Sequence, residues 1–289
     1  MNLYSINTGY FKLDGGAMFG VVPKSIWNKL NPADENNLCS WALRCLLVED
    51  GNRLTLIDNG IGDKQDARFF SHYYLHGDDT LDGSLAKYGF TKDDVTDVLL
   101  THLHFDHCGG SILRVGERLS TAFKYATYWS NEKHWQWATQ PNEREKASFL
   151  KENILPIKES GQLKMIDVDR DQGANTETLQ RAAFSDNISL LLANGHTEAM
   201  MLPTIKYKGK TLVFMADLLP SAAHIPIPYV MAYDMFPLTS LKEKKSFLNE
   251  ALENEYILFY EHDPVYECCT LKSTEKGIRL NETFRLSEL

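Results

Sequence analysis

Short apolar runs of strand length recur along the chain, and several of them end at a histidine or an aspartate. Such runs are predicted at 97–102, 188–196, 211–217 and 256–263. Apolar runs of this length, bounded by turn residues, are typical of buried strands. Because functional side chains tend to lie on loops at one edge of a rigid sheet, these strand ends predict one shared site.

The rest of the chain mixes strands and helices and shows no obvious linker or repeat. Residues 41–48 and 53–58 read as a hairpin around the turn EDGN. A further strand is predicted at 126–130, and helical spacing of apolar residues predicts helices over 81–90, 143–155 and 240–255. We therefore predict one α+β domain spanning residues 1–289.

Composition narrows the environment and the partners. The formal net charge of -9 disfavours nucleic acid as a partner, because phosphate backbones select basic surfaces. The five cysteines form no CxxC pair, which favours a reducing cytoplasm over a disulfide framework. No signal peptide is visible, and no apolar run approaches the roughly 20 residues of a membrane helix.

The densest chemical feature is THLHFDHCGG, residues 101–110, where three histidines and an aspartate fall within six positions. This loop could hold one metal ion, two or none. His102 and His104 are two residues apart and can converge on one ion if the loop curls, whereas Asp106 and His107 would face a second ion. A mixed imidazole and carboxylate set favours Zn²⁺, with Fe, Mn or Co as alternatives. We expect Gly109 and Gly110 to let the backbone approach the ions.

A site of this kind needs more ligands than the loop supplies. His196 and His262 follow predicted strands and are candidates. Asp217 ends the apolar strand VFMAD, where a buried carboxylate needs compensating charge. We assign it the role of bridging two ions.

These residues resemble a known family. THLHFDHCGG matches the HxHxDH signature of the metallo-β-lactamase fold hydrolases, and His196, Asp217 and His262 follow in that superfamily's order. Segments 13–27 and 215–240 look like a narrower group, the YtnP-like quorum-quenching N-acyl-homoserine lactonases, close to methyl parathion hydrolase. The resemblance implies an αββα sandwich of two mixed sheets packed face to face with helices outside.

The resemblance also implies a ligand set. One ion would be held by His102, His104 and His196, and a second by Asp106, His107 and His262, with Asp217 bridging. Asp106 would also orient the hydroxide that attacks the substrate. Cys108 is interpreted as a packed small residue.

Other residues are candidates for supporting roles. Asp58 is either a turn residue or an acceptor that orients a ligand imidazole. Well-studied homoserine lactonases carry a tyrosine three residues after the bridging aspartate, where this chain has Pro220, and His224 is the candidate replacement in catalysis. Phe19, Tyr229 and Phe236 are candidates for the substrate pocket, although the sequence favours a core or subunit contact for each.

We therefore expect a dinuclear metal-dependent hydrolase that uses a metal-bridging hydroxide to open lactones or cleave small esters, including N-acyl-homoserine lactones in quorum quenching. The alternatives are a phosphotriesterase or an aryl-ester or sulfate hydrolase with the same metals. A glyoxalase II-type thioesterase is less favoured, because it needs basic C-terminal residues to hold the glutathione carboxylates, and Arg279 and Arg285 lie in a short tail. The expected partners are a small-molecule lactone or ester and a second copy of the chain, joined in a homodimer through residues 21–27. No membrane partner is expected.

Overall fold

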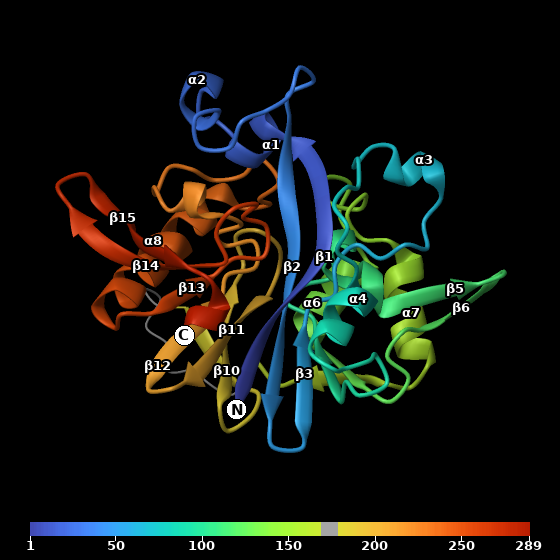
Figure 1. Cartoon of the computed structure of the whole chain (residues 1–289). Helices are drawn as coiled ribbons and strands as arrows, with labels where there is room; N and C mark the ends of the chain where they lie inside the picture. Colours follow the sequence, from blue (N-terminus) through green and yellow to red (C-terminus); the bar gives the residue numbers. More distant parts are fainter. Residues whose placement is uncertain (169–178) are drawn as a thin grey trace. The chain divides into compact units, whose positions relative to one another are not determined.

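The computed structural model describes residues 1–168 and 179–289, and the chain forms two compact units. Unit 1 comprises Met1–Gly9 and Leu43–Asp167, and unit 2 comprises Tyr10–Ala42 and Val168–Leu289. The chain passes between the units along two long strands, β1 (Asn2–Asp14) and β2 (Leu38–Asp50), which stand out in blue in Figure 1. Each unit has its own mixed sheet.

The sheet of unit 1 has six strands in the order β1-β2-β3-β4-β7-β8. Its later strands are β3 (Arg53–Ile57), β4 (Asp97–Leu99), β7 (Thr127–Asn131) and β8 (Leu163–Ile166). The hairpin β2–β3 is antiparallel, whereas β3, β4, β7 and β8 run parallel to one another. Parallel neighbours end at the same edge, so the loops that follow β3 and β4 lie beside each other.

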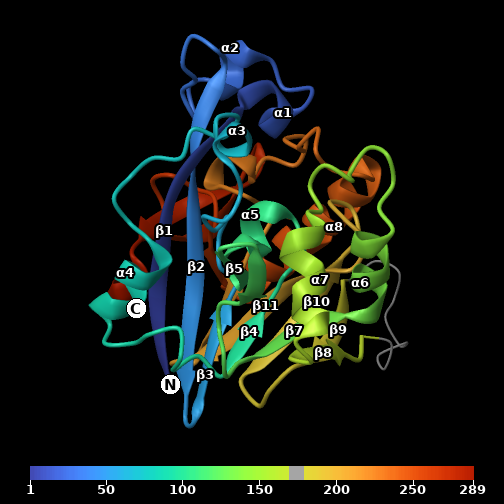
Figure 2. The same ribbon diagram turned by 90° about the vertical axis from the view of Figure 1, so that its right-hand side faces the viewer.

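Helices cover the parallel part of this sheet. Figure 2 shows α5 (Phe105–Cys108), α6 (Glu132–Thr139) and α7 (Lys151–Glu159) over β4, β7 and β8. Val98 and Tyr128 of the strands share one buried apolar cluster with Trp135 and Ile154 of the helices. The remaining elements are α3 (Ala67–Phe70), α4 (Leu81–Lys87), the 3₁₀ turn η1 (Gly109–Ser111) and the hairpin β5 (Ile112–Val115) with β6 (Arg118–Thr121). This core anchors β4, from which the histidine-rich loop leaves.

The sheet of unit 2 has seven strands in the order β15-β14-β13-β12-β11-β10-β9. They are β9 (Gln180–Ala183), β10 (Ile188–Ala193), β11 (Met200–Tyr207), β12 (Lys210–Phe214), β13 (Ile257–Phe259), β14 (Cys268–Thr274) and β15 (Gly277–Phe284). All pairs are antiparallel except β12 with β13. Strands β10, β12 and β13 therefore point the same way, and their carboxyl ends meet at one edge.

Unit 2 carries one long helix and several short ones. The helix α8 (Pro237–Glu253) packs against β14 and β15. The short elements are α1 (Gly15–Phe19), α2 (Lys24–Trp27), η2 (Ala222–His224) and η3 (Leu286–Glu288). The apolar stripe on α8 explains its position, since Phe247, Leu248 and Ala251 are buried.

The predicted α+β class is confirmed, with two mixed sheets and several helices. The hairpin of 41–58 and the strands of 188–217 are confirmed, but the helix predicted over 143–155 begins only at Lys151. Residues 142–148 instead form turns, in which the amides of Glu145 and Lys146 donate to the Asn142 carbonyl. This difference matters, because Glu145 lies in those turns. Among the described residues, no helix is long and apolar enough to cross a membrane.

Candidate metal centre

The histidine-rich loop of unit 1 connects β4 to α5 and is almost completely buried. His102 and His107 have no exposed surface, and His104 and Asp106 are nearly as buried. Phe105, Asp106 and His107 form the first turn of α5, and the amides of His107 and Cys108 donate to the His104 carbonyl. The four candidate ligands therefore sit on one tight turn that packs onto the sheet.

The two glycines after this turn are also required by packing. A Cβ atom on Gly109 would lie 2.0 Å from the carbonyl oxygen of Ile61, and one on Gly110 would lie 2.2 Å from that of Asn59. Their small size is thus required by the close approach of the backbone turn at 59–62. That they also let the backbone approach the ions stays a prediction.

His102 and His104 direct nitrogens toward each other. His102 Nε2 lies 3.1 Å from His104 Nδ1, a distance at which two lone pairs can face one cation. The opposite nitrogen of His102, Nδ1, lies 3.1 Å from the Thr101 hydroxyl. That hydroxyl donates in turn to Asp58 at 2.6 Å, so it accepts from His102. The proton of His102 is thereby held on Nδ1, which leaves Nε2 as the ligand atom.

Asp58 supports two of the histidines from the end of β3. One of its carboxylate oxygens accepts from the Thr101 amide at 2.8 Å, and the other lies 3.1 Å from Nδ1 of His107. Asp58 is fully buried and has a left-handed backbone, with φ of 54°. Asp58 therefore lies as an acceptor behind the imidazole of His107. Because it holds the proton on Nδ1, Nε2 of His107 is left as the ligand atom.

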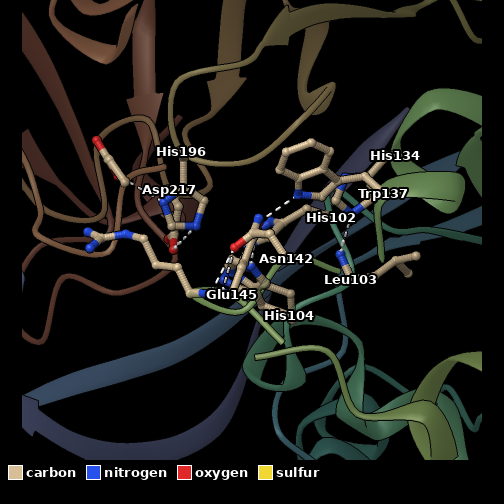
Figure 3. Close-up of polar contacts among 12 residues, drawn as sticks. His102, Leu103, His104, His134, Trp137, Asn142, Glu145, His196 and Asp217 are labelled. Carbon is tan, nitrogen blue, oxygen red and sulfur yellow. Dashed lines mark hydrogen bonds and ion pairs between the residues drawn. The ribbon is translucent and has the colours of Figure 1, made fainter. Parts of the chain in front are cut away.

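Glu145 holds the remaining histidine of the loop. Its Oε1 atom lies 2.9 Å from His104 Nε2 (Figure 3). Its Oε2 atom accepts from the Trp137 indole at 2.6 Å and from the Asn142 amide at 3.3 Å. His104 therefore carries its proton on Nε2 and presents Nδ1, the atom that faces His102.

Unit 2 contributes three candidate ligands from the carboxyl ends of parallel-pointing strands. His196 follows β10, Asp217 follows β12 and His262 follows β13. The two oxygens of Asp217 face different histidines, since Oδ2 lies 3.2 Å from His196 Nε2 and Oδ1 lies 3.2 Å from His262 Nε2. One carboxylate thus faces two imidazoles with two separate oxygens, an arrangement that suits a bridging ligand.

The other nitrogens of these two histidines are also held by acceptors. His196 Nδ1 lies 2.9 Å from the Asp234 carboxylate. His262 Nδ1 lies 2.8 Å from the carbonyl oxygen of Ala42 in β2, and the Ala42 amide donates back to the His262 carbonyl at 3.0 Å. Both imidazoles present Nε2 on the side of Asp217.

All five imidazoles thus share one feature: an acceptor holds the proton on one nitrogen and the other nitrogen faces a further candidate ligand. A histidine binds a metal only through a deprotonated nitrogen, and its second nitrogen is normally held by an acceptor behind it. The donor set fits divalent ions that accept imidazole and carboxylate, zinc foremost. The residues present therefore fit the metal ions that the sequence predicts.

Cys108 lies beside the ligands without the properties of one. It is fully buried, and its thiol donates to the Leu103 carbonyl. Burial raises the pKa of this thiol to about 12, which disfavours the thiolate that a metal needs. Cys108 is a packed core residue of unit 1.

His224, the candidate replacement for a catalytic tyrosine, has both ring nitrogens engaged. Nε2 lies 2.9 Å from the Met18 carbonyl, so it donates, and Nδ1 lies 2.8 Å from the Ser221 hydroxyl. The ring stacks on Phe19 with centroids 4.6 Å apart. Burial lowers the pKa of His224 to about 3, which keeps it neutral. This environment argues against the predicted contact with substrate and favours a structural role.

The three pocket candidates differ in exposure. Phe19 is fully buried between His224 and Trp27, so its burial argues against its predicted role as a pocket wall. Tyr229 is half-buried and contacts Phe19 edge-on. Phe236 is 43% exposed and precedes α8. Phe236 is the only one of the three that offers a large open apolar surface.

Sequence reasoning missed Glu145 and Asp234. Glu145 looks like one more charge on an expected helix, and Asp234 lies in a segment noted only for its resemblance. A buried lysine was missed as well: Lys64 donates to the Gly109 carbonyl at 2.5 Å and ties down the end of the loop. None of these residues stands at a spacing that links it to the HxHxDH motif.

The fold and the site define a class of protein, and comparison with known proteins agrees. A model of the metallo-beta-lactamase superfamily matches residues 44–262, well over half of the chain. The chain therefore belongs to the metallo-beta-lactamase superfamily. No curated protein is significantly similar to it in sequence.

Solved structures share the fold over almost the whole chain. A probable metal-dependent hydrolase from Staphylococcus aureus is 27% identical, with a TM-score of 0.84 and 98% of each chain covered. AidC, a dizinc quorum-quenching lactonase, is 21% identical with a TM-score of 0.77, covering 98% of this chain and 95% of that one. An N-acyl homoserine lactone hydrolase with product at its catalytic metal center is 19% identical with a TM-score of 0.67, covering 91% and 93%. The predicted metallo-β-lactamase fold is confirmed, and these findings support a hydrolase.

Proposed function

We propose that this chain is a dinuclear metal-dependent hydrolase, in which the candidate ligands hold two divalent ions. His102, His104 and His196 would bind one ion, and Asp106, His107 and His262 the other, with Asp217 shared. The observation that carries this proposal is the common arrangement of the five imidazoles, each held by an acceptor at one nitrogen.

The distribution of charge supports two ions. Asp58, Asp106 and Glu145 of unit 1 and Asp217 and Asp234 of unit 2 are all at least 91% buried. Buried carboxylates are costly unless they are paired with cations or hydrogen-bond donors. Two divalent ions would compensate this charge. We propose zinc, with Fe, Mn or Co as alternatives, because such a donor set accepts several ions.

Two bound divalent ions would act as Lewis acids and supply a water nucleophile whose pKa is lowered to about 7. The residues of the chain would then orient the reaction. A carboxylate oxygen of Asp106 can accept a hydrogen bond from the attacking water and aim it at the substrate carbonyl. Asp58, Glu145 and Asp234 would keep the ligand imidazoles fixed, so that the geometry is in place before substrate arrives.

We propose a lactone or small ester as substrate, with N-acyl-homoserine lactones as the first class to test and quorum quenching as the corresponding role. Support comes from the fold neighbours that are themselves named as lactonases. The buried cysteines, all free among the described residues, agree with action in the cytoplasm on a small molecule that reaches it.

One panel tests this function. Zinc-loaded protein of measured metal content would be assayed with N-acyl-homoserine lactones of short and long chains, simple lactones, aryl esters, a phosphotriester, an aryl sulfate and a glutathione thioester. We expect two ions per chain and the highest kcat/KM on a lactone. Highest kcat/KM on the phosphotriester or sulfate would replace the lactone, whereas a protein that binds metal but cleaves nothing in the panel would contradict the hydrolytic role proposed.

We also propose a homodimer that uses the segment 21–27. Val21 is 94% exposed, Ile26 is 46% exposed and Leu30 just beyond is 51% exposed. Clustered exposed apolar side chains are characteristic of interaction sites. Light scattering at micromolar concentration should give twice the mass of the chain, and Val21→Asp should halve it. A monomeric mass for the unaltered protein would contradict the dimer.

A further inference from the structure

Glu145 is a buried carboxylate behind one candidate ligand, and both of its oxygens are engaged. The residue is 2% exposed, and the Trp137 indole and the Asn142 amide both donate to its Oε2 atom. The other oxygen, Oε1, lies 2.9 Å from Nε2 of His104. Figure 3 shows Glu145 with His104, Trp137 and Asn142 around it.

The orientation of Asn142 is itself fixed. Its side-chain oxygen accepts from the backbone amides of Arg144 at 2.9 Å and Glu145 at 3.1 Å. The NH₂ group of Asn142 must therefore be the part that faces Glu145. Two donors with fixed orientation, one from an indole and one from an amide, thus require an acceptor at the Oε2 position.

The turn that carries Glu145 is also tied to the loop backbone. The Ser148 amide donates to the Glu145 carbonyl at 2.8 Å, and the Ser148 carbonyl accepts from the Phe105 amide at 2.9 Å. The Phe149 ring lies 4.8 Å from the His104 ring. Glu145 and His104 are therefore held in register by backbone contacts as well as by their side chains.

We propose that Glu145 is a positioning residue that selects the tautomer of His104. As a carboxylate it only accepts, so it holds the proton on Nε2 and keeps Nδ1 deprotonated as a ligand atom. This inference rests on the proposed metal-dependent function, and it adds a residue on which binding of one ion depends.

The substitution that changes the shape of Glu145 least is expected to disturb metal binding most. In Glu145→Gln, the donors from Trp137 and Asn142 keep the amide oxygen at the Oε2 position. The new NH₂ group then faces His104 and donates to Nε2, which forces the proton onto Nδ1. Glu145→Ala removes the acceptor but imposes no tautomer. Glu145→Gln should therefore weaken metal binding more than Glu145→Ala.

The first measurement is zinc titration of chelator-stripped full-length protein against a competing chromophoric chelator. We expect Glu145→Gln to weaken one of the two ions by roughly 10–100-fold, the range for residues behind metal ligands, and Glu145→Ala to weaken it less. Adding Trp137→Phe to Glu145→Gln removes one donor, lets the amide rotate, and should recover part of the loss. Glu143→Gln is the matched control, because Glu143 lies two residues away with its side chain 88% exposed.

The second measurement reads the tautomer without metal. Long-range ¹H–¹⁵N spectra of the stripped protein, with His104 assigned by loss of its signal in His104→Ala, should show the Nε2–H form in the unaltered protein and the Nδ1–H form in Glu145→Gln. Equal metal loss in the Gln and Ala variants together with an unchanged tautomer would overturn the proposal. If the unaltered protein binds no zinc, the dinuclear function fails, while the tautomer exchange still decides the role of Glu145.

Discussion

The two halves of the candidate ligand set are built in different ways. In unit 1, four candidate ligands come from one turn at 102–107, and the acceptors behind them come from Asp58, Thr101 and Glu145. In unit 2, three candidate ligands come from the ends of three separate strands, with Asp234 and the Ala42 carbonyl behind them. The first half depends on side-chain contacts that stiffen a loop, and the second on a sheet that is already stiff.

This difference indicates where each half is vulnerable. A loop has no ladder of its own to fix its side chains, so removal of one hydrogen-bonded support should disturb several ligands together. Strand ends are positioned by the hydrogen bonds of β10, β12 and β13 with their neighbours. Removal of one support there should disturb a single ligand. Substitutions of one support in each unit test this contrast.

The largest effect is expected at Asp217, the one residue that both ions would share. Asp217→Asn keeps the shape but replaces one anionic oxygen by an NH₂ group that cannot bind a cation. We expect hydrolysis to fall to the uncatalysed background and bound metal to fall below two ions per chain, measured by elemental analysis and by initial rates. His104→Ala should have a comparable effect, and retained activity in a folded, metal-depleted variant would contradict the mechanism.

The next largest effects on metal binding are expected for Asp58→Asn in unit 1 and Asp234→Asn in unit 2. Asp58 accepts from Thr101 and lies behind His107, so its loss should affect both His107 and, through Thr101, His102. Asn tolerates the left-handed backbone of residue 58, so the turn should survive. Asp234 lies behind one ligand imidazole, that of His196, at 2.9 Å.

We therefore expect Asp58→Asn to weaken both ions and Asp234→Asn to weaken one, each by roughly 10–100-fold. Stepwise zinc titration of the stripped variants distinguishes the two patterns. Asp94→Asn, at an exposed turn that caps Thr91, serves as the control. Loss of a single ion in both variants would remove the contrast between the halves.

The same contrast explains how much could be predicted from sequence. The ligands of unit 1 are visible because they are local, and those of unit 2 because each follows an apolar strand. Two of the acceptors behind these ligands, Glu145 and Asp234, cannot be predicted, because they are neither local nor at the end of an apolar strand. Glu145 lies 41 positions from His104 and Asp234 lies 38 from His196, with no periodicity to connect them. Only the folded chain brings these pairs into contact.

The helix prediction is wrong for a similar reason. The charged and apolar pattern of 143–155 predicts one helix, but the turns at 143–148 do not continue into it, and the Ser148 carbonyl accepts instead from the Phe105 amide, which is distant in sequence. The packing requirement for glycine at Gly109 and Gly110 likewise comes from Ile61 and Asn59, which are distant in sequence. Local propensity gives no information about such tertiary contacts.

The smallest effect on catalysis is expected for substitution of His224. A structural role predicts instead a change in how the free energy of unfolding depends on acid pH. In the unfolded chain His224 titrates near its ordinary pKa of 6.5, whereas burial lowers the folded pKa to about 3. Between these values the unfolded state binds a proton that the folded state does not. Stability from this group is therefore fully present above pH 6.5 and is lost as the pH falls from 6.5 toward 3, with a limiting slope of about 1.4 kcal/mol per pH unit.

His224→Gln should lower the thermal midpoint at pH 7, because the contacts with Ser221, Met18 and Phe19 are imperfectly replaced. It should also flatten the loss of stability between pH 6.5 and 4.5, since glutamine does not titrate, while kcat at saturating metal stays close to that of the unaltered protein. Thermal unfolding of the stripped proteins across this pH range, together with steady-state kinetics, measures both quantities. A large fall in kcat with an unchanged acid profile would restore His224 as a residue that acts on substrate, because a group that only fills the core of unit 2 cannot produce that combination.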